Sequence, residues 1–231
     1  MNFLENGYFL LAVTFAVFTL AKLLQKKTGQ LLLNPILITI MVIIAFLKLS
    51  GISYEKYSEA GSLVEFWLKP AVVALGLPLY RQIHVIRKQF LPIFLSQFAG
   101  CVVGVVSVVT VARLMGASDE IIYSLAPKSV TTPIAMEVSS ALGGIPSLTA
   151  AIVVCVGLMG GIFGFKILKW SHIDSPMAQG LSLGAAAHAV GTSSASEISG
   201  RYGAFASLGL ILNGILTALL TPTILRLLGM P

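Results

Sequence analysis

Charged residues are scarce in this 231-residue sequence: Asp, Glu, Lys and Arg make up 10% of it, against 56% hydrophobic residues. Soluble domains carry about a quarter charged residues, so this composition, with a mean hydropathy of +0.93, excludes an ordinary soluble protein. At about 20 residues per crossing, the chain has room for about six to eight membrane segments and for no separate soluble domain. The expected fold class is therefore an all-α polytopic membrane protein.

Cysteine is also scarce, and the N-terminus lacks a basic segment. Cys101 and Cys155 both fall in apolar stretches, where a small hydrophobic role is expected and a disulfide is not indicated. Met1–Glu5 has no Lys or Arg, and the apolar run behind it reaches spanning length, so we expect a retained first helix and no cleaved signal. The net charge of +6 comes from short connectors between apolar runs, which favours a role in membrane topology over a nucleic-acid partner.

Six apolar runs are predicted to cross the membrane as full helices, at 8–24, 31–47, 66–80, 90–114, 147–165 and 204–228. Asn34-Pro35 is predicted to kink or cap the second helix. We expect a polar loop at 48–65, an irregular third span because of Pro70 and Pro78, and a basic connector at 81–88.

Two polar segments, 118–142 and 177–200, interrupt the second half of the chain and are related to each other. At an offset of 60 residues, Lys128–Leu148 matches His188–Leu208 at eight of 21 positions, which indicates an internal repeat. Glycine pairs spaced four apart, which let helices approach closely, recur at the same offset, as Gly100/Gly104 and Gly160/Gly164. Polar, helix-breaking segments at corresponding positions of a duplicated membrane unit indicate a transporter's binding site.

The distribution of basic residues predicts how these segments are oriented. The connectors after the first, third and 147–165 spans contain eight Lys and Arg (Lys22, Lys26, Lys27, Arg81, Arg87, Lys88, Lys166, Lys169) and one acid, Asp174, so all three should be cytoplasmic. Segment 118–142 must then enter and leave on the outer face, as a re-entrant hairpin or two half-helices. A unit of one crossing plus one hairpin has an odd number of crossings, so the second copy is inverted. If segment 177–200 behaves likewise, it re-enters from the cytoplasm.

These predictions divide the chain into four parts. Residues 1–88 are N-terminal helices that provide a scaffold or an oligomer surface, and we expect a homo-oligomer. Residues 89–147 form the first repeat, 148–203 the second repeat, and 204–231 the C-terminal span. The fold thus combines about six full helices with two re-entrant or broken hairpins in an inverted repeat, an architecture typical of alternating access.

The polar segments contain the residue types that hold a small anion. Pro133 suits the first position of a half-helix with Thr132 as its N-cap, and Ser194-Ala195-Ser196-Glu197 has the spacing of a capping box. Both half-helices would present free N–H groups and a positive dipole end to an anion. We therefore predict a small carboxylate as substrate. The predicted binding residues are Lys128, Ser129, Thr131, Thr132, His188, Thr192, Ser193 and Ser194.

Each polar candidate also has a structural interpretation. Burying Lys128 costs about 2.5–3.5 kcal/mol, and it lies beside a helix breaker, which favours a substrate role over snorkelling. Glu137 and Glu197 either couple a proton or cation, or serve as caps and ion-pair partners. His188, equivalent to Lys128, serves a substrate, a proton or packing, and Asn213 is expected to form an interhelical hydrogen bond.

An intramembrane hydrolase with a Ser/Lys or Ser/His pair is a weaker alternative. Adjacent residues on a helix do not face each other, and a third orienting group is not evident. We expect no enzyme activity, no metal site and no cofactor.

Several motifs together resemble the LrgB/CidB family of bacterial inner-membrane proteins, over nearly the whole length. They are Leu33-Asn34-Pro35, Pro70–Leu75 with Pro78-Leu79-Tyr80, Pro127–Ala135, Gly144-Ile145-Pro146, His188–Thr192, and Glu197 with Gly203-Ala204-Phe205. The resemblance implies a multi-pass protein of the bacterial cytoplasmic membrane that works with a small holin-like LrgA/CidA membrane protein.

The same resemblance implies two functions. One is control of murein hydrolase export and cell lysis, as an antiholin-like regulator without carrier activity. The other is transport of small monocarboxylates, because the chain is also similar to the C-terminal part of the plastid glycolate/glycerate translocator and bacterial members are linked to pyruvate uptake. We therefore expect a carrier of glycolate, glycerate, pyruvate or lactate, with the regulator as the alternative.

Overall fold

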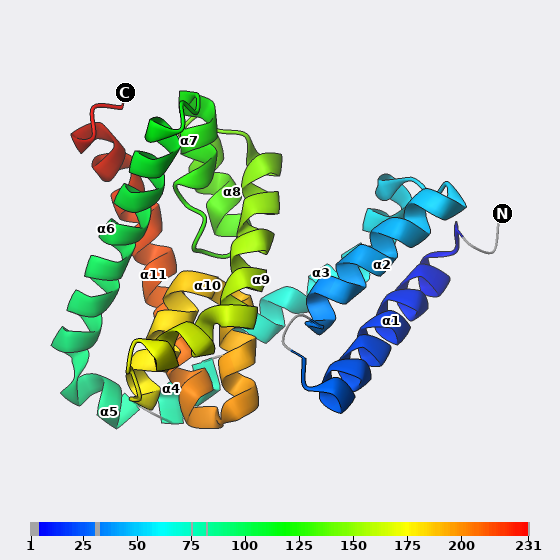
Figure 1. Cartoon of the computed structure of the whole chain (residues 1–231), viewed down its shortest axis with the longest axis horizontal. Coiled ribbons are helices and arrows are strands. Elements are labelled where there is room, and N and C mark those ends of the chain that lie inside the picture. Colours follow the sequence, from blue (N-terminus) through cyan, green and yellow to red (C-terminus); the bar gives the residue numbers. More distant parts are fainter. Residues whose placement is uncertain (1–4, 31–32, 75, 82, 231) are drawn as a thin grey trace. The chain divides into compact units, whose positions relative to one another are not determined.

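The computed structural model describes residues 5–30, 33–74, 76–81 and 83–230, and every regular element in this part is helical (Figure 1). Predictions that involve Met1–Leu4, Leu31, Leu75 and Gln82 lie outside the described residues. The chain separates into two units, Met1–Gly76 and Leu77–Pro231. The all-α polytopic fold expected from the composition is confirmed.

The N-terminal unit consists of three helices, α1 (Gly7–Thr28), α2 (Pro35–Ser50) and α3 (Tyr54–Ala74), with α1 packed against the other two. As predicted, Asn34 caps α2: its Oδ1 accepts hydrogen bonds from two backbone N–H groups of the first turn, and Pro35 occupies the first helical position. A small core of Leu10, Ile52 and Ala60 joins the helices.

The predicted polar loop at 48–65 is wrong, because α3 already begins at Tyr54. Glu55, Lys56 and Glu59 are good helix formers, and an acidic residue in the first turn favours a helix N-terminus. Polarity was therefore a poor indicator of a loop. The expected basic connector is also largely helical, as α4 (Gly76–Arg81) and α5 (Ile83–Lys88).

Four helices in the described part of the chain are long and apolar enough to span a membrane: α1, α6 (Phe90–Leu114), α9 (Pro146–Trp170) and α11 (Gly200–Leu227). α2 is apolar but has only 16 residues. Large hydrophobic side chains such as Phe15, Leu95 and Leu219 are exposed on these helices. Exposed apolar faces of this extent fit lipid as the surrounding solvent.

The C-terminal unit contains two helical hairpins that enter from opposite ends (Figure 1). The first consists of α7 (Asp119–Leu125) and α8 (Thr132–Ala141), and it lies at the end of the unit where α6 ends and α9 begins. The second is α10 (Pro176–Ile198), which lies at the end where α9 finishes and α11 begins. The chain therefore enters and leaves segment 118–142 at one end, as the charge parity predicted.

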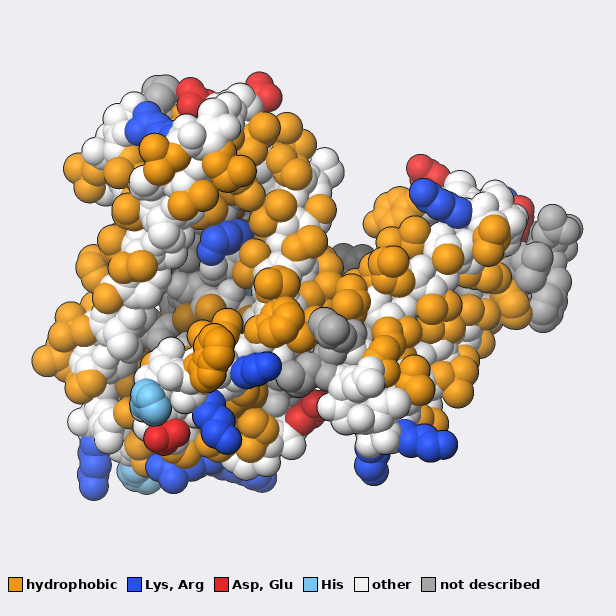
Figure 2. Space-filling view, in the orientation of Figure 1, with side chains coloured by type: hydrophobic (Ala, Val, Ile, Leu, Met, Phe, Trp, Pro, Cys, Tyr) orange, Lys and Arg blue, Asp and Glu red, His pale blue; other side chains and the backbone are white. Residues whose placement is uncertain are grey.

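The two ends of this unit differ in charge (Figure 2). We call the end that carries Arg87, Lys88, Lys166 and Lys169 the basic end, and the opposite one the α7 end. A hydrophobic cluster lies between α6, α7 and the C-terminal part of α11 at the α7 end. Its buried members are Val105, Val109, Ala112, Ile122, Tyr123, Ala126, Ile224, Leu225 and Met230.

Candidate functional site

The two hairpins are broken at corresponding positions of the repeat. The first break is the turn between Leu125 and Thr132, and the second lies inside α10, where Ala187 and His188 have non-helical backbone angles. At the 60-residue offset, Ala187 and His188 correspond to Pro127 and Lys128. The two breaks thus fall at equivalent positions of the repeat.

The second half of α10 folds back on the first. A Cβ atom on Gly191 would lie 2.4 Å from the carbonyl oxygen of Leu183, eight residues earlier. In a straight helix these positions are about 12 Å apart along the axis. Only glycine at position 191 allows so close a return.

His188 holds this break against α9. Its φ of 41° with ψ of −130° lies where residues other than glycine are strained. The buried ring donates from Nε2 to the Val153 carbonyl oxygen at 2.9 Å, and the Thr192 hydroxyl donates to the His188 carbonyl oxygen at 2.9 Å. These hydrogen bonds favour the strained conformation, so the structure gives His188 a positioning role.

Both predicted N-caps are displaced in the structure. Thr131, and not Thr132, occupies the N-cap position of α8, without a side-chain capping hydrogen bond, and Pro133 lies in the first turn. The predicted capping box at Ser194–Glu197 is wrong, because those residues lie inside α10 after its break. The spacing suggested a helix start there, but the His188 hydrogen bonds place the interruption earlier.

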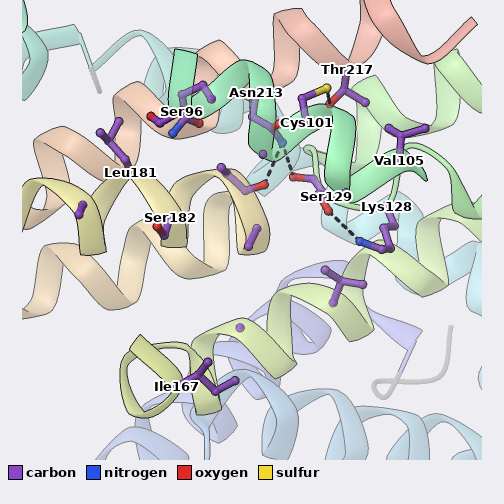
Figure 3. A pocket seen from close by; sticks show the side chains of 18 of the residues that line it. Ser96, Cys101, Val105, Lys128, Ser129, Ile167, Leu181, Ser182, Asn213 and Thr217 are labelled. Atoms are coloured by element: carbon purple, nitrogen blue, oxygen red, sulfur yellow. Dashed lines mark hydrogen bonds between the residues drawn. The ribbon is translucent and has the colours of Figure 1, made fainter. Parts of the chain in front are cut away.

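Asn213, on α11, joins the two breaks. Its Nδ2 donates to the carbonyl oxygen of Ser129 at 3.2 Å and to that of Ala185 at 2.8 Å (Figure 3). Carbonyl groups near helix ends lack intrahelical partners, so a buried amide that reaches both satisfies two otherwise costly groups. The interhelical hydrogen bond predicted for Asn213 is confirmed, and Asn213 forms two such hydrogen bonds instead of one.

A cavity of about 800 Å³ lies beside this junction, within the range of small-molecule sites. α6, α9, α10, α11 and the first break line it (Figure 3). Its polar lining residues are Ser96, Gln97, Lys128, Ser129, Ser182, Asn213 and Thr217. The remaining lining is apolar or small, so the charged group of Lys128 is the dominant electrostatic feature.

Lys128 is half-buried and donates from Nζ to the Ser129 hydroxyl at 3.1 Å. Adjacent residues on a helix would not face each other, but Lys128 and Ser129 lie in a turn and do contact each other. The described lining of the cavity contains no Asp, Glu or His that could orient such a pair. Lys128 and Ser129 are the two predicted binding residues that the structure brings into one cavity.

The other predicted site residues lie outside that lining. They are Thr131, Thr132, His188, Thr192, Ser193 and Ser194, with the proposed coupling residues Glu137 and Glu197. His188 and Thr192 are buried within the second break, whereas Glu137 and Glu197 are exposed. Their roles in binding and coupling stay predictions.

The cavity extends from the breaks toward the basic end. Pro92 near the start of α6, Ile167 near the end of α9 and Met177 at the start of α10 line that part of it. In the other direction, beyond Val105, the apolar cluster at the α7 end fills the space between the helices. The cavity therefore extends further toward the basic end than toward the α7 end.

The repeated glycine pairs have different surroundings. Gly160 and Gly164 allow close contact with α10, since added Cβ atoms would lie 2.1 Å from the Ala187 Cβ and 2.4 Å from Leu183 Cδ2. Gly100 and Gly104 instead line the cavity, with nothing within 4 Å of an added Cβ. Close helix packing was predicted for both pairs, and it is wrong for the first because the cavity lies there.

Sequence reasoning missed Gln97, Ser96, Thr217 and Ser182 as cavity residues. They are isolated polar residues in apolar or small-residue stretches, and isolated polar residues in a membrane helix are a usable signal. Cys101, expected to be a small buried hydrophobe, is buried with its Sγ 3.5 Å from Thr217 Oγ1.

Apolar spanning helices, two helix breaks that approach from opposite ends and a lysine in a cavity at their junction characterise a polytopic membrane protein with a cavity of small-molecule size. The chain matches the LrgB-like family over residues 14–227, and it belongs to that family.

Similar proteins match along almost their full length. The holin-like protein CidB of Staphylococcus epidermidis is 35% identical over 98% of this chain and 99% of its own. CidB of Staphylococcus aureus is 34% identical over the same shares, and the uncharacterized protein YwbG of Bacillus subtilis is 35% identical over 95% of this chain and 97% of its own. No solved structure matches the chain.

Proposed function

We propose that this protein is a secondary carrier of small monocarboxylates, of the glycolate, glycerate, pyruvate and lactate class. The observation that carries the proposal is the ammonium group of Lys128 in a largely apolar cavity where the two helix breaks meet. A charged group at membrane depth is costly without a counter-charge, and a carboxylate supplies one. The N-terminus of α8, which begins at Thr132 and has no side-chain capping hydrogen bond, adds positive potential.

The arrangement of the two hairpins supports alternating access as the transport mechanism. The cavity extends toward the basic end, which the positive-inside rule assigns to the cytoplasm, and the carrier would take this side as its entrance in the present arrangement. The apolar cluster at the α7 end then acts as the closed outer barrier. Because Asn213 is bonded to both breaks, movement of one hairpin is transmitted to the other.

Coupling and partners belong to the same proposal. Glu137 or Glu197, both exposed here, would couple a proton or cation only after a rearrangement of the hairpins. The protein would work in the bacterial cytoplasmic membrane as a homo-oligomer, together with a small LrgA/CidA-like membrane protein.

Uptake into liposomes tests the carrier. Purified protein should give saturable uptake of labelled glycolate or pyruvate, and Lys128→Ala should abolish it. Lys166→Ala is the matched control, because this exposed lysine of α9 does not line the cavity. Uptake that survives Lys128→Ala would overturn the proposed role of the lysine.

The relatives named holin-like favour a second candidate, a regulator of murein hydrolase export and cell lysis without carrier activity. The same liposomes distinguish the two. A pore component would release unrelated solutes in order of their size and without saturation. A regulator alone would neither take up carboxylates nor release solutes.

A further inference from the structure

We propose that Gln97 selects 2-hydroxy over 2-oxo acids by accepting a hydrogen bond from the substrate's hydroxyl group. The inference rests on the proposed carrier function and names one subsite of its cavity. Gln97 lies in α6, lines the cavity and is only 3% exposed. Lys128 would hold the carboxylate of the same substrate.

The Gln97 side chain has an unused acceptor. In the part of the chain that the structure describes, Gln97 Oε1 and Ser207 Oγ are the buried side-chain polar atoms that lack a hydrogen-bond partner. Buried polar groups are nearly always paired, so each exception calls for an explanation, such as a functional role or an ordered water. Ser207 does not line the cavity, whereas Gln97 does. Gln97 Oε1 is itself buried, so the amide must turn toward the cavity when the substrate binds.

The helix register places Gln97 beside the junction of the breaks. Cys101 Sγ and Thr217 Oγ1 lie 3.5 Å apart and align α6 with α11, which both run from the basic end to the α7 end (Figures 1 and 3). One helical turn earlier on each helix are Gln97 and Asn213. Asn213 has both amide hydrogens committed to the break carbonyls, so it leaves Gln97 Oε1 without a donor.

The chemistry of the substrate then decides which acids fit. A 2-hydroxy acid brings one donor, its hydroxyl hydrogen, besides the carboxylate that Lys128 neutralises. The anion of a 2-oxo acid has acceptors only, so it would leave Gln97 Oε1 unpaired and place a carbonyl oxygen near it. A site with a buried acceptor discriminates against an analogue that lacks the donor.

Lactate and pyruvate are the matched probes, because they share three carbons and one charge and differ at C2. Full-length protein in liposomes should take up labelled lactate about tenfold faster than pyruvate. A tenfold difference corresponds to the free energy of about one hydrogen bond. Gln97→Leu should lower lactate uptake about tenfold, keep pyruvate uptake within about twofold, and leave the melting temperature without substrate unchanged or higher. Ser207→Ala should leave the lactate-to-pyruvate ratio unchanged. Gln97→Met, of similar length, replaces Gln97→Leu if the latter does not fold.

Three outcomes would overturn the inference. An unchanged ratio in Gln97→Leu means that water satisfies the amide and that Gln97 selects nothing. If the wild-type protein prefers pyruvate and Gln97→Leu abolishes that preference, Gln97 presents its Nε2 donor to the substrate and not its Oε1 acceptor. If wild-type protein moves neither acid, the carrier function fails and this subsite fails with it, whereas uptake of both acids with an unchanged ratio removes the subsite alone.

Discussion

Replacing Asn213 by Leu tests whether one side chain ties the two helix breaks together. Leucine has about the same size but no donors, so the carbonyl oxygens of Ser129 and Ala185 lose the hydrogen bonds that Asn213 gives them at 3.2 and 2.8 Å. Asn213 is 3% exposed, so water does not readily replace the amide. Two such losses cost about 2–4 kcal/mol in the free energy of unfolding.

The matching assay is thermal melting in detergent together with uptake in liposomes. At about 2–4 °C per kcal/mol for a chain of this size, Asn213→Leu should melt about 4–16 °C below wild type and lose most carboxylate uptake. Thr217→Val, one turn along α11, removes only the 3.5 Å contact with Cys101 and should shift melting by about 2 °C or less. An Asn213→Leu protein that melts and transports like wild type would refute the role of Asn213 as the link.

Three further predictions follow from the packing of the C-terminal unit. Gly160→Ala should lower the melting temperature clearly, because the new Cβ would lie 2.1 Å from Ala187 Cβ, whereas Gly100→Ala has nothing within 4 Å and should melt like wild type. The free energy of unfolding in denaturant should be about 1 kcal/mol higher for His188→Gly than for His188→Ala. Both variants lose the ring, but only glycine accepts φ 41° without strain. Equal stabilities would contradict this. Ser182→Cys in a cysteine-free background should react with an impermeant thiol reagent from the basic end only, and labelling from the α7 end alone would reverse the assigned opening.

Charge parity and the repeat predicted the topology of the C-terminal unit, because both depend on residue types rather than on packing. The basic connectors required segment 118–142 to return to the same end, and the structure agrees. The second break lies at Ala187 and His188, the counterparts of Pro127 and Lys128, so the structure preserves the repeat. Local cap patterns failed at Ser194, because the break in α10 is held by a hydrogen bond to α9 that no short motif encodes.

The site was predicted only in part, because some of its features depend on contacts between helices that are far apart in the sequence. Lys128 and Ser129 were found because a lysine in an apolar region is conspicuous. Gln97 was missed because its significance depends on an empty hydrogen-bond position, which appears only when α6 and α11 are aligned. The hydroxyl groups of Thr192 and Ser196 donate to carbonyl oxygens one turn earlier in their own helix, so they are occupied by the backbone.

The unequal packing of the two glycine pairs suggests what the opposite conformation looks like. If the two copies of the repeat exchange conformations during a transport cycle, Gly100 and Gly104 should close on Pro127 and Tyr123, the counterparts of Ala187 and Leu183. Gly160 and Gly164 would separate from α10 at the same time and open an entrance at the opposite end, related to the present one by the pseudo-two-fold axis of the repeat. A disulfide between cysteines at positions 104 and 123 would then trap the carrier in its outward-open conformation. In the present arrangement nothing lies within 4 Å of a Cβ atom at position 104, so the disulfide is not expected here.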